Sequence, residues 1–461
     1  MDNRLTRCIY DHSPVLCQEL FASVFGLRKR LIRSGKHFGK YYSFFRDART
    51  WSRSDLEAFQ DEKIETLIRY CYEHVPFYRQ RMDNNKLTPA DIVRVADLPK
   101  LPVLEKSDVR SAGSSLLSDA IPKKSMLSAT TSGSTGYPLT NYWSLETEQR
   151  EYAFSWARRK PGVKRGDSYG SFTGLQIVKA DCMHPPFWRH NYAANQTCYS
   201  IFHITPQTIP LYVNEIRRRQ HVYLTGYPSV IAMLGRHIVE HSLARPEGIK
   251  AVFVTSEQLL PEYRHWIEYG FNAHAYDMYG QNEKSSSITE YECGHMHYDM
   301  DYGVIEFCPY EQSEEGLPLY EMICTGFDNL ASPLLRYRVG DLVARPEKDV
   351  ICEHIASPVI SYVYGRTSHT LVTSDGRRIG NISVIAKRCN HIEGMQCLQN
   401  EPGRLEVRVI KAKDYTSEDE INIREQFKQK MGRIDLRITY VDQLERTSSG
   451  KLLSIICRIK S

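Results

Sequence analysis

The chain has 461 residues, of which 41% are hydrophobic and 25% are charged, and its formal net charge is +5. A chain of this length is too long to fold around one small core, so two or three domains are predicted. So mild a net charge does not call for a nucleic-acid partner. The sequence shows neither an export signal nor an apolar run of about 18 residues, so no membrane-spanning segment is expected. Twelve cysteines, mostly isolated, are typical of reduced thiols in a cytoplasmic protein.

A basic segment, RKRLIRSGKHFGK, begins with Arg28 and ends with Lys40. It departs from the mixed charge pattern of the rest of the chain. A solvated helix face is the ordinary interpretation, and peripheral contact with an anionic membrane or a polyanionic substrate is the alternative.

Residues 54–82 carry apolar positions at helical spacing. Ser54 is the expected N-cap, and the pair Val75 and Pro76 predicts a break, because proline cannot donate the next helical hydrogen bond.

The stretch SATTSGSTGYPL, residues 128–139, is rich in Ser, Thr and Gly. Such a backbone bends sharply and presents many N–H and O–H donors to an anion, as phosphate-holding loops do. A flexible linker is the alternative. The stretch lacks the Gly-Lys-Ser/Thr ending of a P-loop, so a phosphate site here takes its lysine from elsewhere.

Two later segments, residues 248–259 and 271–283, predict buried strands that lead into loops. Strands separated by helical stretches predict an α/β protein with substantial parallel sheet, in which ligands bind beyond the carboxyl ends of the strands. A hinge is expected near residues 362–380, followed by a small separate domain.

Four further motifs follow the Ser/Thr/Gly stretch in order. They are YGQNE at residues 279–283, LLRYRVGDLV at 334–343, YGR ending at Arg366, and ERTSSGKLL at 445–453. With these five motifs in this order, the chain resembles the adenylate-forming ligase superfamily, and more closely its phenylacetate-coenzyme A ligase branch with the CapK-like proteins. The resemblance runs from about residue 60 to residue 454.

The resemblance implies a large N-terminal α/β adenylation domain, residues 1–364, and a small mobile α+β lid domain, residues 365–461. It implies catalytic roles for Lys451, Glu283 and Arg366. The residues that it assigns to ATP are Thr131, Ser132, Gly133, Ser134, Thr135, Gly136, Ser256, Glu257, Asp277, Met278, Tyr279, Gly280, Asn282 and Asp341.

Each role has a chemical reason. Joining a carboxylate to the α-phosphate of ATP brings two anions together, so catalysis depends on positioning and charge neutralisation. By resemblance, Glu283 binds Mg²⁺, Asp341 accepts from both ribose hydroxyls, and Lys451 stabilises charge on the α-phosphate. Tyr279 is expected to stack on adenine, and Asp277 to accept from the adenine amino group.

The chain departs from the superfamily pattern in three places. Leu139 stands where many members have lysine, and Asn282 where threonine or serine is usual. Near the hinge, Ser368 and His369 stand where relatives commonly have acidic residues. These hinge residues leave the acyl acceptor open between coenzyme A and an amine.

A second site is suggested by Cys293 with His297 and by Cys352 with His354. Two pairs of sulfur and nitrogen ligands complete a tetrahedral Zn²⁺ site of a structural kind, and ordinary burial of these residues is the alternative. His295 is a substitute for His297, although His297 fits the H-x-x-x-D-Y pattern of the phenylacetate ligase branch better.

The sequence therefore predicts an ATP- and Mg²⁺-dependent ligase that forms an acyl-adenylate and transfers the acyl group to coenzyme A. An amide ligase acting on an amine, with a role in surface polysaccharide synthesis, is one alternative. A non-catalytic, zinc-stabilised nucleotide-binding protein is another. The carboxylic acid is expected to bind near residues 223–230 and 255–258, but its identity does not follow from the sequence.

Overall fold

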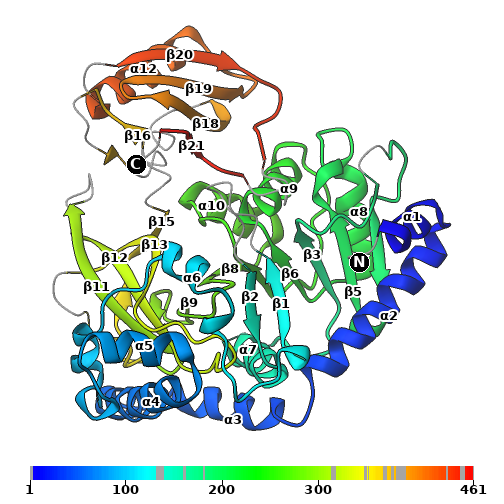
Figure 1. Cartoon of the computed structure of the whole chain (residues 1–461). Helices are drawn as coiled ribbons and strands as arrows, with labels where there is room; N and C mark the ends of the chain where they lie inside the picture. The colour runs from blue at the N-terminus through cyan, green and yellow to red at the C-terminus, as the bar shows by residue number, and fades with distance from the viewer. Residues whose placement is uncertain are drawn as a thin grey trace.

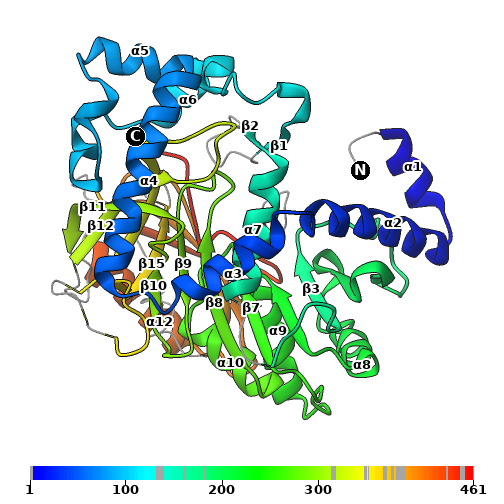
Figure 2. The same ribbon diagram turned by 90° about the horizontal axis from the view of Figure 1, so that it is seen from below.

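The computed structural model describes residues 4–130, 140–158, 162–179, 182–312, 318–346, 350, 352–366, 371–374, 378–379, 391–431, 434–446 and 452–459. The chain begins with helices α1 (Arg4–His12), α2 (Val15–Arg33), α3 (Phe38–Ala48), α4 (Arg53–His74) and α5 (Pro76–Asn84). Figure 2 shows α1 and α2 extending away from α4 and α5. Within the ranges given above, none of the helices combines the length and the apolar run that crossing a bilayer requires.

Helices α4 and α5 confirm the helix predicted in this region and its break at Pro76. Helix α4 ends at His74 because Val75 precedes the proline and is extended, with φ −123° and ψ 101°. The expected cap at Ser54 is wrong. Ser52 caps α4 instead: its Oγ accepts from the Asp55 N–H at 3.2 Å, and the Asp55 carboxylate accepts in return from the N–H of Ser52.

A nine-stranded mixed sheet forms the centre of the molecule (Figure 1). In spatial order its strands are β14 (Val359–Ile360), β10 (Met296–Tyr298), β9 (Ser287–Glu290), β8 (His274–Gly280), β7 (Ala251–Val254), β6 (Tyr223–Gly226), β3 (Tyr169–Thr173), β5 (Gln196–Ser200) and β4 (Trp188–Asn191). The run from β8 to β5 is parallel, and the strands at both ends pair antiparallel. The predicted α/β fold and the strands β7 and β8 are confirmed.

Helices pack against this sheet, and those that follow β5, β6 and β7 enclose the largest core. They include α7 (Leu145–Arg158), α8 (Ile209–Arg219), α9 (Pro228–Glu240) and α10 (Pro261–Phe271), and α6 (Lys106–Ala112) lies nearer the N-terminal helices. Helices α9 and α10 approach closely at two glycines, since a Cβ on Gly270 would lie 2.4 Å from the Cα of Gly235. Short 3-10 helices occupy Pro89–Asp91, Val95–Lys100, Gly113–Leu116, Lys123–Ser125, Tyr192–Ala194 and Ile201–His203.

A second, antiparallel sheet contains β11 (Gly303–Gln312), β12 (Pro318–Gly326), β13 (Tyr337–Ala344) and β15 (Tyr362–Arg366). Two smaller ladders are β1 (Leu127–Thr130) with β2 (Thr140–Trp143), and β16 (Leu371–Val372) with β17 (Arg378–Ile379). Thr130 lies opposite Thr140, so the segment between β1 and β2 joins two paired strands rather than two independent units.

The C-terminal sheet has the order β20 (Asp435–Tyr440), β19 (Arg404–Lys411), β18 (Ile392–Glu401) and β21 (Ile455–Cys457). Helix α12 (Ser417–Met431) covers one face, with Ile423 and Phe427 buried in the same core as Val407 and Val409. Figure 1 shows this unit above the central sheet. The division of the chain at residue 364 stays a prediction.

Candidate active site

Loops that follow three parallel strands meet at one edge of the central sheet. Gly226 at the end of β6 pairs with Val254 of β7, and Val254 pairs with Asp277 of β8. The predicted nucleotide residues Ser256 and Glu257 follow β7 directly, and residues 277–280 close β8. Ser256 has a φ of 73°, a left-handed conformation that turns the chain sharply after the strand.

Tyr279 and Asp341 are joined across 62 residues of sequence. The Tyr279 hydroxyl donates to Asp341 Oδ2 at 2.6 Å and accepts from the Gln281 amide at 2.6 Å. Burial, with the Asp341 carboxylate beside it, raises the pKa of Tyr279 well above its ordinary value, so the hydroxyl stays a donor. Asp341 also lies opposite Arg366 in the β13–β15 ladder, which brings two predicted site positions together.

Asp277 lies in an environment that disfavours its charge. Burial, and then the nearby Glu290 carboxylate, raise the pKa of Asp277 to about 7, although Arg264 acts in the opposite direction. Arg264 is bound to Glu290 at 2.7 Å, and Glu290 in turn accepts from the Asp277 backbone N–H at 3.0 Å. Asp277 therefore lies in β8 with its backbone fixed by Glu290 and with the pKa of its carboxyl raised to about 7.

Glu257 connects the central sheet to the C-terminal motif. Its Oε1 accepts from the backbone N–H of Leu452 at 2.7 Å, and its Oε2 accepts from the Ser229 N–H at 3.3 Å. Arg446 lies 3.9 Å from Glu257 and donates to the Ser229 hydroxyl at 3.4 Å. Burial raises the pKa of Glu257 despite these partners. Glu257 thus places Leu452 at the same strand ends as the predicted nucleotide residues.

Glu283, after the end of β8, lines a pocket of about 300 Å³ together with residues of α6, of β2 and of the segment 329–334. Two cationic residues, Arg110 and Lys123, line the same pocket. Thr140 and Asn141 of β2, which come directly after the Ser/Thr/Gly stretch, also line it. A carboxylate beside cations at this place suits a divalent ion shared with phosphate oxygens, and the carboxylate of Glu283 is the group that would hold Mg²⁺.

Four potential metal ligands gather beside β10. Ligand atoms of Cys293, His295, His297 and Cys352 all lie within 4.8 Å of one another. The Nδ1 of His297 lies 2.7 Å from the Ser357 carbonyl oxygen, and its Nε2 lies 3.4 Å from Cys293 Sγ. When Nδ1 carries the proton, this carbonyl holds the ring with Nε2 toward the thiols, which is how metal-binding histidines are oriented. Two sulfurs and two nitrogens suit tetrahedral Zn²⁺.

This group differs from the predicted zinc set by one residue. His354 is exposed and is not a member of the four-residue group, whereas His295 is. His295 lies directly before β10 and His297 lies on it, with ring centroids 6.3 Å apart. The sequence favoured His297 with His295 as its substitute, and the group contains both.

Other predicted site residues lie outside what the structure describes. These are Thr131, Ser132, Gly133, Ser134, Thr135 and Gly136, together with Leu139, Ser368, His369 and Lys451. For Arg366 the backbone is described and the side chain is not. Met278, Gly280 and Asn282 lie on β8 and in the turn after it, as expected.

Sequence reasoning missed Arg110 and Lys123 in the Glu283 pocket. Asn329 was also missed; it lines this pocket, and its amide donates to the Tyr142 carbonyl at 2.9 Å. These residues come from distant parts of the chain, and no motif marks them.

Comparison with known proteins finds similar sequences. A model described as the CapK C-terminal domain matches residues 371–458. The chain is 26% identical to Protein CapK of Staphylococcus aureus, over 98% of this chain and 99% of that protein. It is 23% identical to the phenylacetate-coenzyme A ligase of Thermus thermophilus, over 70% of this chain and 73% of that protein.

Two solved structures share the fold at low identity. A 2-hydroxyisobutyryl-CoA ligase in its postadenylation state matches with a TM-score of 0.68 and 16% identity, over 89% of this chain and 91% of that one. The anthranilate CoA ligase AuaEII matches with a TM-score of 0.51 and 11% identity, over 88% and 80%. The expected resemblance is confirmed: this chain has the fold of the adenylate-forming ligases, is similar to CapK over nearly its whole length, and matches a model of the CapK C-terminal domain.

Proposed function

We propose that this protein is an AMP-forming acid ligase that acts in two steps. In the first, a carboxylate oxygen attacks the α-phosphate of ATP, forming an acyl-adenylate and releasing pyrophosphate. In the second, the thiol of coenzyme A attacks the acyl carbon and AMP leaves. The similarity to phenylacetate-coenzyme A ligase and the shared fold support this reaction class.

One observation carries the proposal. The N–H of Leu452, the residue after Lys451, binds Glu257 at 2.7 Å, beside the strand ends that hold Asp277 and Tyr279. A terminal lysine motif brought to the carboxyl ends of parallel strands suits a reaction in which anionic phosphates are bound there.

Each predicted site residue has a task in the proposed reaction. Asp341, held by Tyr279, accepts from the ribose hydroxyls, and Arg366 contacts the ribose or a phosphate. Thr131 to Gly136 hold the β- and γ-phosphates, and Glu283 holds Mg²⁺, which supplies charge neutralisation to the phosphate oxygens. Lys451 stabilises the charge that develops on the α-phosphate.

Coenzyme A is the proposed acceptor. The solved structures that share the fold are described as CoA ligases, and the curated relatives include phenylacetate-coenzyme A ligases. These descriptions do not support an amine acceptor. The one feature that favours it is the presence of Ser368 and His369 where relatives commonly have acidic residues.

The test is a screen of carboxylic acids, aromatic and small hydroxy acids among them, for acid-dependent pyrophosphate release with and without coenzyme A. Mass spectrometry then identifies the products. A thioester is expected. An acyl-adenylate that persists with coenzyme A but is consumed by an amine would contradict the acceptor and leave adenylation intact.

The same screen tests the non-catalytic alternative. If the protein binds ATP by calorimetry while no acid elicits pyrophosphate release, the ligase proposal fails and a nucleotide-binding role replaces it.

A further inference from the structure

Helix α2 is folded onto the protein with its polar side inward. Its buried residues are Gln18, Glu19 and Gly26. The large apolar side chains of the helix point away from the protein instead. Five of them recur every three or four residues and so lie along one side of the helix, with exposed fractions of 78% for Leu16, 65% for Leu20, 60% for Val24, 47% for Leu27 and 68% for Leu31.

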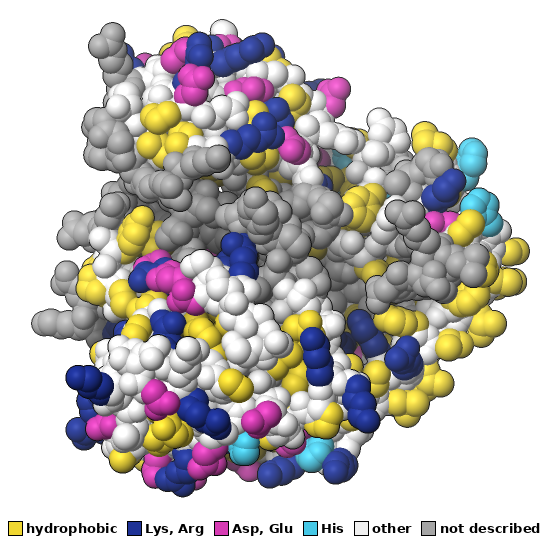
Figure 3. Space-filling view, viewed as in Figure 1, with side chains coloured by type: hydrophobic (Ala, Val, Ile, Leu, Met, Phe, Trp, Pro, Cys, Tyr) yellow, Lys and Arg dark blue, Asp and Glu magenta, His cyan; other side chains and the backbone are white. Residues whose placement is uncertain are grey.

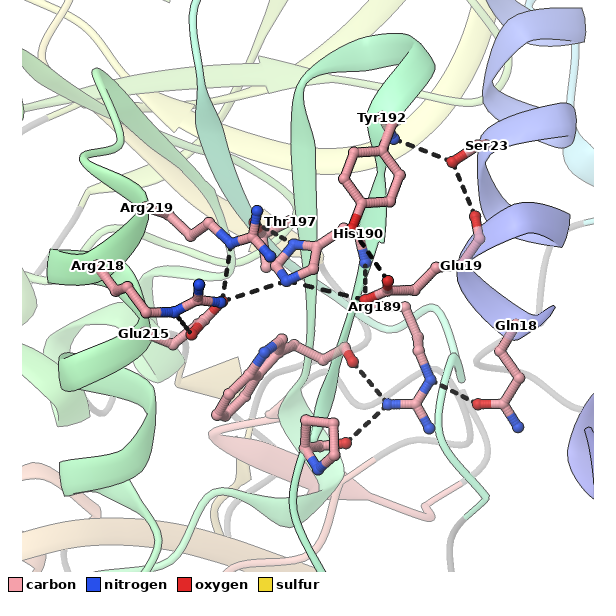
Figure 4. A network of polar contacts seen from close by, with 12 residues as sticks. Gln18, Glu19, Ser23, Arg189, His190, Tyr192, Thr197, Glu215, Arg218 and Arg219 are labelled. Carbon is pink, nitrogen blue, oxygen red and sulfur yellow. Dashed lines mark hydrogen bonds and ion pairs between the residues drawn. The ribbon is translucent and has the colours of Figure 1, made fainter. Parts of the chain in front are cut away.

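A polar network with β4 and the residues after it fixes this orientation (Figure 4). Arg189 donates to Gln18 Oε1 at 2.5 Å, and the His190 N–H donates to Glu19 Oε1 at 3.2 Å. The Tyr192 N–H donates to the Ser23 hydroxyl at 3.0 Å.

Gly26 completes the contact of α2 with β4. A Cβ there would meet the Asn191 side chain at 2.2 Å, so the helix backbone lies directly against the strand. Turning the apolar stripe inward would break these hydrogen bonds and leave buried polar groups without partners, at a cost of about 1–3 kcal/mol each. The outward stripe is therefore a stable feature of the fold.

The exposed charge of α2 is entirely basic. Glu19 is its one acidic residue, and it is buried. Arg28, Lys29 and Arg30 are exposed near its end, with Arg30 also donating to the Ala193 carbonyl at 3.1 Å, and Lys36 and Lys40 follow. Figure 3 shows apolar side chains gathered over α1 and α2 on the right of the molecule, with Lys and Arg side chains at the lower end of this band.

We propose that α2 is an interfacial helix that binds the surface of an anionic lipid bilayer. The apolar stripe, Leu16, Leu20, Val24, Leu27 and Leu31, enters the boundary between headgroups and acyl chains. The basic cluster, Arg28, Lys29 and Arg30, binds lipid phosphates. An apolar face beside basic residues is the composition of helices that lie in the membrane interface.

Charge favours this occupant over a second copy of the chain. The α2 of another copy presents the same basic cluster and has no exposed carboxylate to complement it. An anionic bilayer offers both an apolar layer and a negative surface, and so satisfies both features of the helix.

The test is co-sedimentation of the full chain with vesicles of phosphatidylcholine alone and of phosphatidylcholine mixed with phosphatidylglycerol. Binding to the anionic vesicles, weakened by salt, is expected. Leu20→Gln/Val24→Gln should weaken it about tenfold or more. Arg28→Gln/Lys29→Gln/Arg30→Gln should weaken it by roughly a hundredfold.

Two variants serve as matched controls. Leu175→Gln removes an apolar side chain of 57% exposure from another surface, and Arg217→Gln removes an exposed cation from α8. Both should bind anionic vesicles as the wild type does. Thermal unfolding of the other variants should match the wild type, because their substituted side chains are exposed, whereas the triple variant also loses the hydrogen bond from Arg30 to the Ala193 carbonyl and should unfold slightly earlier.

Two results would overturn the proposal. One is a wild-type chain that binds neither kind of vesicle. The other is a dimer in analytical ultracentrifugation that Leu20→Gln/Val24→Gln dissociates, which would assign the stripe to a second copy. Neither result bears on pyrophosphate release, so this proposal and the ligase proposal stand or fall separately.

Discussion

The hydrogen bond from Tyr279 to Asp341 orients the Asp341 carboxylate beside the end of β8. A carboxylate fixed in this way can accept from a ribose diol in the ground state and the transition state alike. Asp341→Ala should therefore weaken ATP binding about tenfold to a hundredfold, the range for lost hydrogen bonds to a charged group. Isothermal titration calorimetry with ATP measures it.

Two variants separate the role of Asp341 from a general effect of charge. Asp442→Ala removes an exposed carboxylate in the C-terminal part and should leave ATP affinity unchanged. Tyr279→Phe keeps the ring and removes the donor, so it should weaken binding less than Asp341→Ala. Equal affinity for Asp341→Ala and the wild type would mean that Asp341 has no part in holding ATP.

Asp277 predicts a dependence of stability on pH. Its pKa is raised from the ordinary 3.8 to about 7, so the folded chain binds this proton more tightly than the unfolded chain. Between about pH 4 and 7 the unfolded state loses the proton first, and the Asp277 contribution to the free energy of unfolding falls as pH rises. Above about pH 7 both states are ionised and the contribution is constant.

Asp277→Asn should remove this decline because the amide does not titrate. In urea unfolding at several pH values, the stability of the variant relative to the wild type should increase from pH 4 to 7 and then level off. Asp442→Asn, at an exposed position, should show no such trend. A relative stability of Asp277→Asn that does not vary with pH would contradict the raised pKa.

The site residues could be predicted from the sequence only where a motif marks them. Tyr279 and Asp341 were each expected at the nucleotide, but their bond spans 62 residues and depends on how two sheets meet. The capping error has a local cause. Ser52 and Ser54 are both good caps, and the choice rests on Asp55, which stands three residues after Ser52 and closes a capping box with it.

At the scale of elements, the strand pair β9–β10 and the loop before β14 carry the four-residue cluster of Cys293, His295, His297 and Cys352. We expect close to one Zn²⁺ per chain in protein purified without added metal, measured by elemental analysis. Cys293→Ser and Cys352→Ser should each lose the metal and lower the melting temperature, because a structural Zn²⁺ joins segments far apart in sequence.

His354→Ala is the matched control for the metal. This histidine is near Cys352 in sequence but lies outside the cluster, so the variant should keep its zinc. If a folded wild-type sample contains only a small fraction of an equivalent of zinc, the four side chains do not form a metal site and are ordinarily packed residues. Loss of zinc in His354→Ala would mean that His354 is a zinc ligand, as the sequence predicts.

Elements with a strong local pattern could be predicted, and their orientation could not. The apolar spacing and Pro76 define α4 and α5, and the buried runs of β7 and β8 read directly as strands. Helix α2 is different, since an amphipathic pattern ordinarily places its apolar face inward. Its inverted orientation follows from Arg189, His190 and Tyr192, which are too far away in sequence to be connected with it.

At the scale of the whole molecule, the central sheet supplies the strand ends and the C-terminal sheet supplies a segment that reaches them. The bond between Leu452 and Glu257 joins the two, with Arg446 and Ser229 beside it. A model of the CapK C-terminal domain matches residues 371–458, a range that includes the motif with Lys451. The proposed reaction would therefore depend on contact between two separately packed cores.

This dependence gives the last prediction. Lys451→Ala should slow acid-dependent pyrophosphate release on the order of 10² to 10³ fold, the range for removing one preorganised charge-stabilising group. ATP affinity by calorimetry should change little, because a residue that acts on the transition state contributes little to the ground state. Lys413→Ala, an exposed lysine before α12, is the matched control and should retain wild-type rates. If Lys451→Ala releases pyrophosphate at near the wild-type rate, the charge on the α-phosphate is stabilised by another group, for which Arg446, 3.9 Å from Glu257, is a candidate.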